Sequence, residues 1–297
     1  MKLNGGGKMW TEMITLQAPY DVDRLFGRVN MDPLQYKEID RKLLKVPLVL
    51  ESGDAVVSVQ SIGTPSKPAF EIKGEVMFQK EEAMTRIREI FDFDMRPENI
   101  LAALKGTEIG PLVDCYVGMP IICEPNAYCA LLKNIVHQQL NMTFAYTLTH
   151  RFVTRYGREK DNVWFYPEAE VVSKLTVEEL RELQFSKRKA EYVIGIAQKI
   201  VSGELMIEEL CKLSNDEVYE KLLPLRGVGP WTVECVLLFG LGRKDILPAG
   251  DVGIQNALKK WFDLSTKPTK EELYTYNEKW SPYSSYVSMY LWESLSG

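Results

Sequence analysis

The chain holds few of the residues from which metal centres and hydrolytic triads are built. Its 297 residues include only two histidines and five cysteines. His137 and His150 have no acidic partner at ligand spacing, which argues against a metal centre or a serine–histidine hydrolase. No Cys-x-x-Cys pair occurs and no cysteine follows Cys235, so zinc sites and a C-terminal iron–sulfur cluster are disfavoured.

Long apolar runs are also missing. The first residues include Gly5, Gly6 and Gly7 and charged side chains, but no apolar core of signal-peptide length. No stretch approaches the length of a membrane span. We therefore expect a cytoplasmic protein that does not contact a membrane. Hydrophobic residues make up 45% of the chain, which is sufficient for sizeable cores.

Positive charge is in short supply, since 36 lysines and arginines stand against 41 aspartates and glutamates. The net charge of −5 and the isoelectric point near 5.4 argue against a protein that binds nucleic acid mainly by neutralising phosphates. A small footprint on DNA that uses backbone amides is compatible with this balance. The basic run at residues 187–189 would then add local positive potential.

The order of patterns along the chain predicts an α+β fold. From about residue 12 to residue 79, alternating apolar and polar residues indicate short strands. From about residue 80 onward the periodicity is helical. We expect a small antiparallel sheet with one early helix in an N-terminal domain of residues 1–94, followed by an all-helical body over residues 95–297.

A glycine hairpin at residues 223–232 is the most informative motif. Gly227 and Gly229 flank Val228, which permits positive φ values and lets a large ligand approach the backbone closely. Pro230 occupies a first helical position, and an apolar helix follows. Unpaired amides at such a helix start can bind a phosphate group, although an ordinary tight turn between packed helices has the same pattern.

Asp251 follows the hairpin and its helix after a short loop. Residues 216–223 before the hairpin have the pattern of an amphipathic helix, so the order is helix, hairpin, helix, loop and a lone carboxylate. Asp251 can also cap the helix expected at residues 252–262. Capping fixes the backbone while one carboxylate oxygen can still point into a pocket, so a structural role and a catalytic role are compatible.

This order resembles the helix-hairpin-helix DNA glycosylase superfamily, whose hairpin is followed at a similar distance by a catalytic aspartate. Arg226 stands where that family usually has proline. Short segments that follow in the same order are similar to the DNA-3-methyladenine glycosylase II branch, which removes alkylated bases; they are residues 16–27, 88–94, 135–140, 185–190 and 280–292. The resemblance implies a helical body of two lobes with the pocket in their cleft.

The resemblance implies a monofunctional DNA glycosylase that flips an alkylated purine, such as 3-methyladenine or 7-methylguanine, out of duplex DNA and hydrolyses its N-glycosidic bond. Members that also cut the strand have a lysine where this chain has Trp231. Asp251 would stabilise the oxocarbenium-like sugar and orient the attacking water. Trp231 and Trp280 would stack on the cationic base, with burial in the core as the alternative for Trp231.

The same resemblance assigns the contacts with DNA. Gln139 would fill the gap left by the flipped nucleotide, with a polar side chain at a helix end as the alternative. A DNA phosphate would be held by Gly227, Val228 and Gly229. A monovalent cation, Na⁺ or K⁺, would be held by the carbonyls of Leu223, Leu225 and Val228. No other cofactor is required, and we expect a monomer that binds double-stranded DNA containing damaged bases.

Two departures from the family bear on which bases are accepted. Cys235 stands where the best-known members have an aromatic residue, and Gly253 stands where they have a larger apolar one. Two other functions stay open. The chain can be a non-catalytic DNA-damage binding protein that keeps the hairpin without the chemistry, or a glycosylase for oxidised purines, which the absent lysine at position 231 disfavours.

Overall fold

The computed structural model describes residues 8–295 of the chain. Its strands are β1 (Trp10–Thr15), β2 (Tyr36–Glu38), β3 (Leu43–Leu50), β4 (Gly53–Ser61), β5 (Ala69–Gly74), β6 (Arg158–Lys160) and β7 (Val163–Phe165). Its α-helices are α1 (Val22–Asn30), α2 (Lys80–Ile90), α3 (Pro97–Leu104), α4 (Gly110–Tyr116), α5 (Ala127–His137), α6 (Met142–Tyr156), α7 (Ala169–Val172), α8 (Val177–Glu182), α9 (Lys187–Val201), α10 (Asn215–Leu222), α11 (Pro230–Cys235), α12 (Val252–Trp261), α13 (Lys270–Trp280) and α14 (Ser284–Glu293). Two short 3₁₀ helices are η1 (Met77–Gln79) and η2 (Ile207–Lys212). The segment η3 (Val236–Gly240) is a π-helix.

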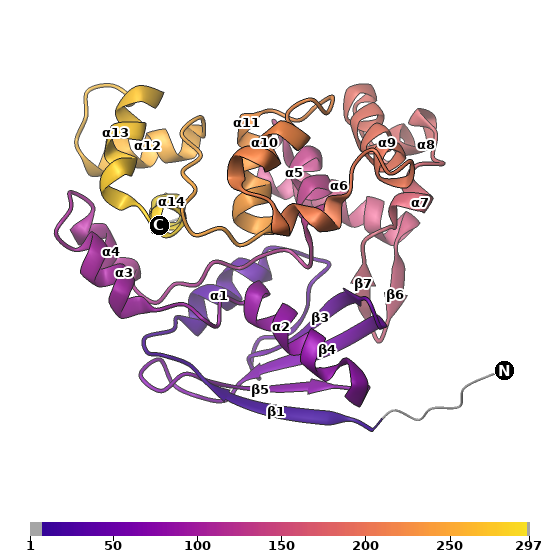
Figure 1. Ribbon diagram of the computed structural model, residues 1–297, viewed down its shortest axis with the longest axis horizontal. Helices are drawn as coiled ribbons and strands as arrows, with labels where there is room; N and C mark the ends of the chain where they lie inside the picture. Colours follow the sequence, from indigo (N-terminus) through magenta and orange to yellow (C-terminus); the bar gives the residue numbers. More distant parts are fainter. Residues whose placement is uncertain (1–7, 296–297) are drawn as a thin grey trace.

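The first five strands form one antiparallel sheet in the order β1-β5-β4-β3-β2. Because side chains alternate along a strand, one face of the sheet carries Val57, Val59 and Ile72, all buried in the core. α1, which Asp21 caps through the N–H of Arg24, and α2 lie between this sheet and the other helices (Figure 1). The predicted N-terminal sheet and its early helix are therefore confirmed.

A short hairpin, β6–β7, departs from the predicted all-helical body. Its turn residues Asp161 and Asn162 have φ values of 54° and 62°, the left-handed pair that a two-residue hairpin of this hand requires. Val163 and Phe165 pack on Val56 on the outer face of the sheet. This hairpin therefore ties the second half of the chain to the N-terminal sheet.

One continuous core joins the sheet to the helices. Most buried apolar side chains of both parts belong to a single cluster. Near their junction the buried carboxylate of Asp92 accepts hydrogen bonds from the Tyr286 hydroxyl at 2.8 Å, the Lys244 ammonium at 2.8 Å and the Ile121 N–H at 3.2 Å. The domain boundary expected after residue 94 falls beside this junction, and it stays a prediction.

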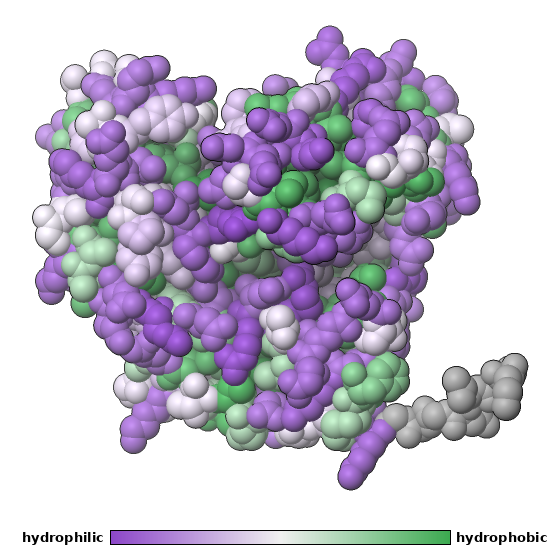
Figure 2. Space-filling view, viewed as in Figure 1, coloured by the Kyte–Doolittle hydropathy of each residue, from purple (hydrophilic) through white to green (hydrophobic). Residues whose placement is uncertain are grey.

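Helices α5 to α14 form two groups above the sheet in Figure 1, with α12, α13 and α14 on one side and α5 to α11 on the other. The surface is hollowed between the two groups and is mainly hydrophilic on the visible face (Figure 2). The predicted α+β class with a two-lobed helical body is confirmed. None of the helices in residues 8–295 is both long enough and apolar enough to cross a membrane.

Candidate active site

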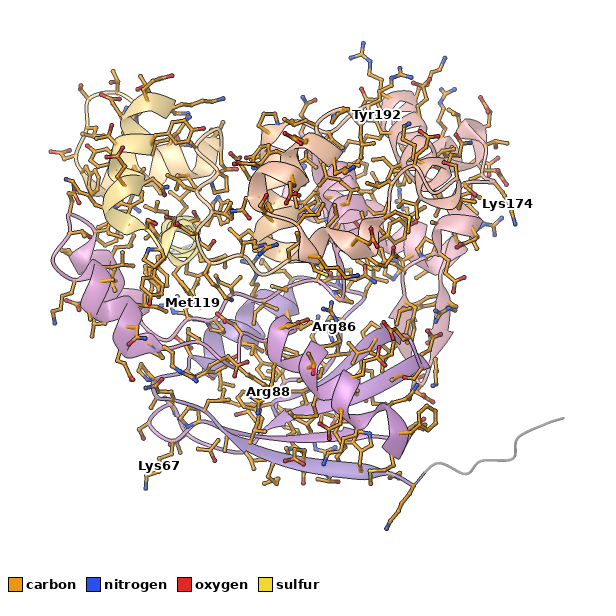
Figure 3. The ribbon with its side chains drawn as sticks, viewed as in Figure 1. Lys67, Arg86, Arg88, Met119, Lys174 and Tyr192 are labelled. Carbon is orange, nitrogen blue, oxygen red and sulfur yellow. The ribbon has the colours of Figure 1, made fainter. Side chains whose placement is uncertain are left out.

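The predicted glycine hairpin joins α10 to α11. The N–H of Val228 donates to the carbonyl of Leu225 at 3.0 Å and closes the turn. Gly227 has a φ of +91°, and a Cβ built on it would lie 2.2 Å from the ring of Tyr192, which projects from α9 (Figure 3). Only glycine fits this position without strain, because both the backbone conformation and the close approach exclude a side chain.

The hairpin leaves backbone donors available. Among the described residues, the N–H groups of Gly227 and Gly229 donate to no recorded acceptor. Gly229 is the N-cap of α11, and its carbonyl accepts from Thr232 and Val233. Pro230 occupies the first helical position, where no N–H is needed. Free N–H groups at a helix start are what the predicted phosphate contact requires, and the contact itself stays a prediction.

Asp251 caps α12, and two tryptophans hold its carboxylate. The Ile254 N–H donates to Oδ1 at 2.9 Å, as the capping prediction requires. The indole N–H of Trp231 donates to Oδ2 at 2.8 Å, and that of Trp292 donates to Oδ1 at 2.8 Å. A carboxylate accepts about four hydrogen bonds, so these three donors leave room for one more partner. The capping role is therefore confirmed, and it leaves an acceptor position open for a chemical role.

A cavity of about 1560 Å³ lies against this carboxylate. Its walls include Trp231, Trp292, Phe239 and Cys235 as well as Asp251. The rings of Phe239 and Trp292 are stacked, with centroids 5.9 Å apart. Burial is the main reason that the pKa of the Cys235 thiol is well above its ordinary value, so this side chain is a neutral part of the wall.

The prediction that Trp280 stacks on a base is wrong. Its side chain is 0% exposed and is not among the residues that line the cavity. It stacks instead on Tyr276, one turn earlier in α13, with ring centroids 5.8 Å apart. Trp280 therefore belongs to the core of its lobe. Trp292 is the tryptophan of the closing segment that faces the cavity.

The loop between α5 and α6 carries Gln139, the predicted wedge that would fill the gap left by a flipped nucleotide. Gln139 is exposed at the rim of the cavity and has a φ of +56°. Its neighbour Gln138 donates to the carbonyl of Gly227 at 3.0 Å and to the hydroxyl of Thr232 at 2.9 Å. The loop and the hairpin are thus fixed to each other, which places Gln139 beside the turn expected to hold DNA.

Lys189 supports this loop from the other side. Its ammonium donates to the carbonyls of Val136 at 2.5 Å and Gln138 at 2.6 Å, at the C-terminal end of α5. Burial lowers the pKa of Lys189 to about 8. The side chain therefore serves the loop, and within the basic run 187–189 it is less available to DNA than a freely exposed lysine.

The surroundings of Gly253 explain in physical terms why glycine stands at this position. A Cβ at this position would lie 2.8 Å from Asp251 Oδ1 and 3.2 Å from the indole of Trp292. The carboxylate and the indole fill the space next to Gly253. A side chain at position 253 would push one of them away.

We expect Gly253→Ala to lower the rate of base release by about tenfold to a hundredfold, because small displacements of a reacting group cost this much. Gly250→Ala is the matched control, since its Cβ would meet only the end of the Lys270 side chain, at 3.5 Å. Single-turnover rates measured with both variants check the prediction. Equal rates for the two variants would contradict the proposed fit around Asp251.

Comparison with known proteins identifies the family. The model of the HhH-GPD superfamily of base excision DNA repair proteins matches residues 132–282, just over half of the chain. This chain belongs to the HhH-GPD superfamily. The protein YfjP of Bacillus subtilis, provisionally named a DNA-3-methyladenine glycosylase, is 39% identical over 288 residues, which cover 97% of this chain and 100% of YfjP.

Two further comparisons agree with this result. A DNA-3-methyladenine glycosylase of Bacillus subtilis is 31% identical over 226 residues, covering 73% of this chain and 74% of the relative. The fold is similar to that of a 3-methyladenine DNA glycosylase from Archaeoglobus fulgidus, with a TM-score of 0.81, 24% identity and coverage of 95% of this chain and 97% of that one. The predicted resemblance to the methyladenine glycosylase branch is confirmed.

The sequence of this HhH-GPD chain did not reveal three features of its site. Trp292 was visible only as part of a similar C-terminal segment, and Gln138 only as the neighbour of the predicted wedge. A largely buried lysine in the cavity wall, Lys133, had no sequence signal, because one acidic partner, Asp32, lies 101 residues away and the other, Glu124, lies nine residues before it at no helical spacing. The pattern of α5 alone would place Lys133 on a solvated face.

Proposed function

We propose that this chain is a monofunctional DNA glycosylase that hydrolyses the N-glycosidic bond of alkylated purines in duplex DNA. One observation supports the proposal above all others. The carboxylate of Asp251 is held by the indoles of Trp231 and Trp292 at the wall of a cavity, in the same short segment of chain as a phosphate-binding turn. The relatives named DNA-3-methyladenine glycosylases support the substrate class.

Asp251 is the proposed catalytic residue. As the base departs, positive charge develops on the deoxyribose, and a fixed carboxylate stabilises it without reorganising. The Trp231 and Trp292 N–H groups hold both oxygens in place. The remaining acceptor position can receive a proton from the attacking water, which gives general base assistance. The products are a free base and an abasic sugar in an uncut strand.

The cavity offers no lysine that is ready to attack the sugar. Trp231 occupies the place of the nucleophilic lysine of strand-cutting members, and an indole cannot form a Schiff base. Lys133 also lines the cavity, but its ammonium is bound to Asp32 at 2.9 Å and Glu124 at 2.8 Å. Although burial alone lowers the pKa of Lys133, Glu124 and Asp32 outweigh it and raise that pKa well above its ordinary value. A protonated amine is not a nucleophile.

The electron-rich wall suits a cationic purine. Alkylation at N3 or N7 gives the base a positive charge, which improves it as a leaving group. Ring faces attract such cations, and Trp231, Trp292 and Phe239 supply them in this cavity. Here Trp292 takes the stacking role first expected of Trp280.

The proposed contacts with DNA come from the glycine hairpin and from the wedge residue Gln139. The free N–H groups of Gly227 and Gly229 bind one phosphate, and Gln139 enters the space left by the flipped nucleotide. Among the described residues the carbonyls of Leu223 and Val228 accept no recorded backbone hydrogen bond, while that of Leu225 accepts one. Such oxygens fit a monovalent cation, which would bridge the hairpin and the phosphate.

Arg226 at the tip of the hairpin is proposed to add a phosphate contact. Its side chain is 73% exposed, and it pairs with Glu191 at 2.9 Å. We expect Arg226→Ala to lower the slope of log affinity against log salt by about one and to weaken binding of all sequences alike. Lys174→Ala is the control, because Lys174 lies at the edge of the molecule in Figure 3, away from the hairpin. An unchanged slope would exclude Arg226 from the contact.

Product analysis of the wild-type protein tests the function. Methylated duplex DNA is incubated with the protein, freed bases are separated by chromatography, and the strands are examined before and after alkali. The proposal predicts free methylated purines and strands that break only after alkali. No released base would indicate a DNA-damage binding protein, and a covalent adduct trapped by borohydride would indicate a lysine mechanism.

A further inference from the structure

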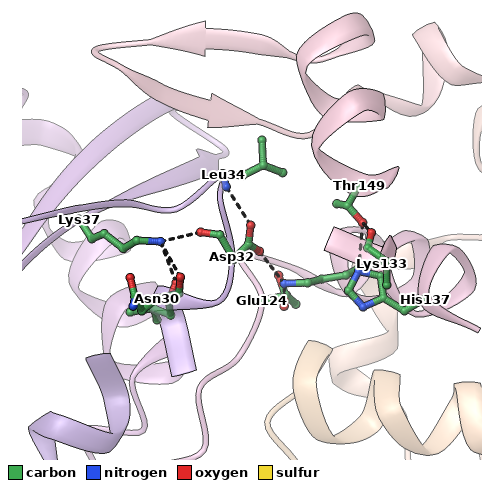
Figure 4. Close-up of polar contacts among 10 residues, drawn as sticks. Asn30, Asp32, Leu34, Lys37, Glu124, Lys133, His137 and Thr149 are labelled. Carbon is green, nitrogen blue, oxygen red and sulfur yellow. Dashed lines mark hydrogen bonds and ion pairs between the residues drawn. The ribbon is translucent and has the colours of Figure 1, made fainter. Parts of the chain in front are cut away.

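A largely buried ion triad lies in the wall of the cavity that is also lined by Asp251. The ammonium of Lys133, on α5, donates to Asp32 Oδ2 at 2.9 Å and to Glu124 Oε1 at 2.8 Å (Figure 4). Asp32 follows α1 in the N-terminal part of the chain, and Glu124 precedes α5. All three side chains line the cavity.

The triad is charged and mostly removed from water. The side chains of Lys133, Asp32 and Glu124 are only 15%, 17% and 23% exposed. Burial alone raises the pKa of Asp32, but the Lys133 ammonium and the Leu34 N–H outweigh it and lower that pKa. Two carboxylates and one ammonium leave a formal charge of −1 on the triad.

One further cation lies close to the triad: the Lys37 ammonium donates to the backbone carbonyl of Asp32 at 2.8 Å (Figure 4). Lys37 does not line the cavity, so the charge of the triad still faces the cavity. His137 packs edge-on against Tyr146, with ring centroids 5.1 Å apart, and its Nε2 lies 3.0 Å from the Thr149 hydroxyl. Burial and the nearby Lys133 lower the pKa of His137 to about 3, so the imidazole is neutral at physiological pH. Among residues 8–295, six carboxylates and three cationic side chains line the cavity, which leaves an excess of three negative charges.

Stability alone does not account for such a triad. Taking three ionised groups out of water costs free energy that their mutual attraction barely returns, and apolar residues of similar size commonly serve a core as well or better. Here the groups line the same cavity as Asp251, and perturbed ionisable residues in a cleft tend to have a functional role. The field of the triad acts on whatever occupies the cavity, because the protein around the cavity screens charge less than bulk water does.

We infer that the Asp32–Lys133–Glu124 triad is a specificity determinant that favours purines carrying a positive charge over neutral modified purines. The inference rests on the proposed function. The triad acts on the base rather than on the sugar, so its contribution is to binding and to the selection among lesions. Asp251 serves every substrate equally, whereas the triad distinguishes 3-methyladenine and 7-methylguanine from a neutral base such as hypoxanthine.

The test is a change of one charge with little change of shape. Glu124→Gln keeps an oxygen for Lys133 and removes one negative charge, so the triad becomes neutral. We expect the ratio of kcat/KM for 7-methylguanine to that for hypoxanthine to fall by about tenfold, mainly through the methylated base. Asp32→Asn removes one negative charge from the other acidic partner of Lys133 and is expected to lower the same ratio by a similar factor. Glu209→Gln, at an exposed position outside the cavity, is the control.

The outcomes separate the two proposals. Release of bases by the wild type with an unchanged ratio in both variants, whose folding is verified by thermal unfolding, overturns the role of the triad and leaves the proposed function standing. An equal loss on both substrates also overturns it, because a merely structural role lowers all rates together. No release of any base by the wild type overturns the function and the inference with it.

Discussion

Asp251→Asn is expected to lower the rate of base release by about a thousandfold, which is the effect of removing a fixed electrostatic partner of a transition state. The amide removes the negative charge that faces the sugar. It also offers one acceptor oxygen where the carboxylate offers two, so one of the indole donors, Trp231 or Trp292, faces an NH₂ group instead. The rate is measured in single turnover on methylated duplex DNA by chromatography of the freed bases.

A measurement of DNA binding distinguishes this loss of catalytic rate from misfolding of the variant. The affinity of the Asp251→Asn variant for a duplex with an abasic site is expected to stay near the wild-type value, because the hairpin and the wedge are untouched. Asp263→Asn is a matched control, since it makes the same chemical change at an exposed residue outside the cavity. A variant that retains full activity would remove Asp251 from the mechanism.

Gly227→Ala is expected to have the second large effect, on both stability and DNA binding. A φ of +91° is unfavourable for alanine, and its Cβ would lie 2.2 Å from the Tyr192 ring. Strain and overpacking of this kind each cost roughly 1–3 kcal/mol, so the free energy of unfolding should fall by about 3 kcal/mol. Because the hairpin must deform, we also expect affinity for abasic DNA to fall at least tenfold.

Gly229→Ala, two residues further on, is the matched control for the loss of stability. A Cβ there would meet nothing within 4 Å, and the φ of −112° is ordinary for any residue. We expect its unfolding free energy to change by less than about 1 kcal/mol. Denaturant unfolding of the two variants measures the difference. Equal stabilities would show that the hairpin is not held in the conformation described.

The hairpin and Asp251 were predictable because their signals are local. Two glycines, a proline at the first helical position and an acid at the next helix start each fix the backbone within a few residues. Conformation and spacing along the chain then bring Trp231 and Asp251 to the same place. These parts of the site follow from the sequence with little help from tertiary structure.

The aromatic wall and the ion triad were not predictable in the same way. Trp280 and Trp292 lie in the same closing segment, and only the packing of α13 and α14 decides that the first is buried and the second faces the cavity. The triad joins Asp32, Glu124 and Lys133 from three separate segments. Nothing in the local sequence of any one of them indicates that they meet.

The most direct test of the central claim is a crystal structure of the Asp251→Asn variant bound to a duplex that contains a non-hydrolysable analogue of 3-methyladenine. The account predicts the modified nucleotide turned out of the helix, its base against Trp231 and Trp292, its anomeric carbon facing residue 251, and Gln139 in the vacated space. A base that stays stacked in the duplex, or that enters the protein away from residue 251, would contradict it.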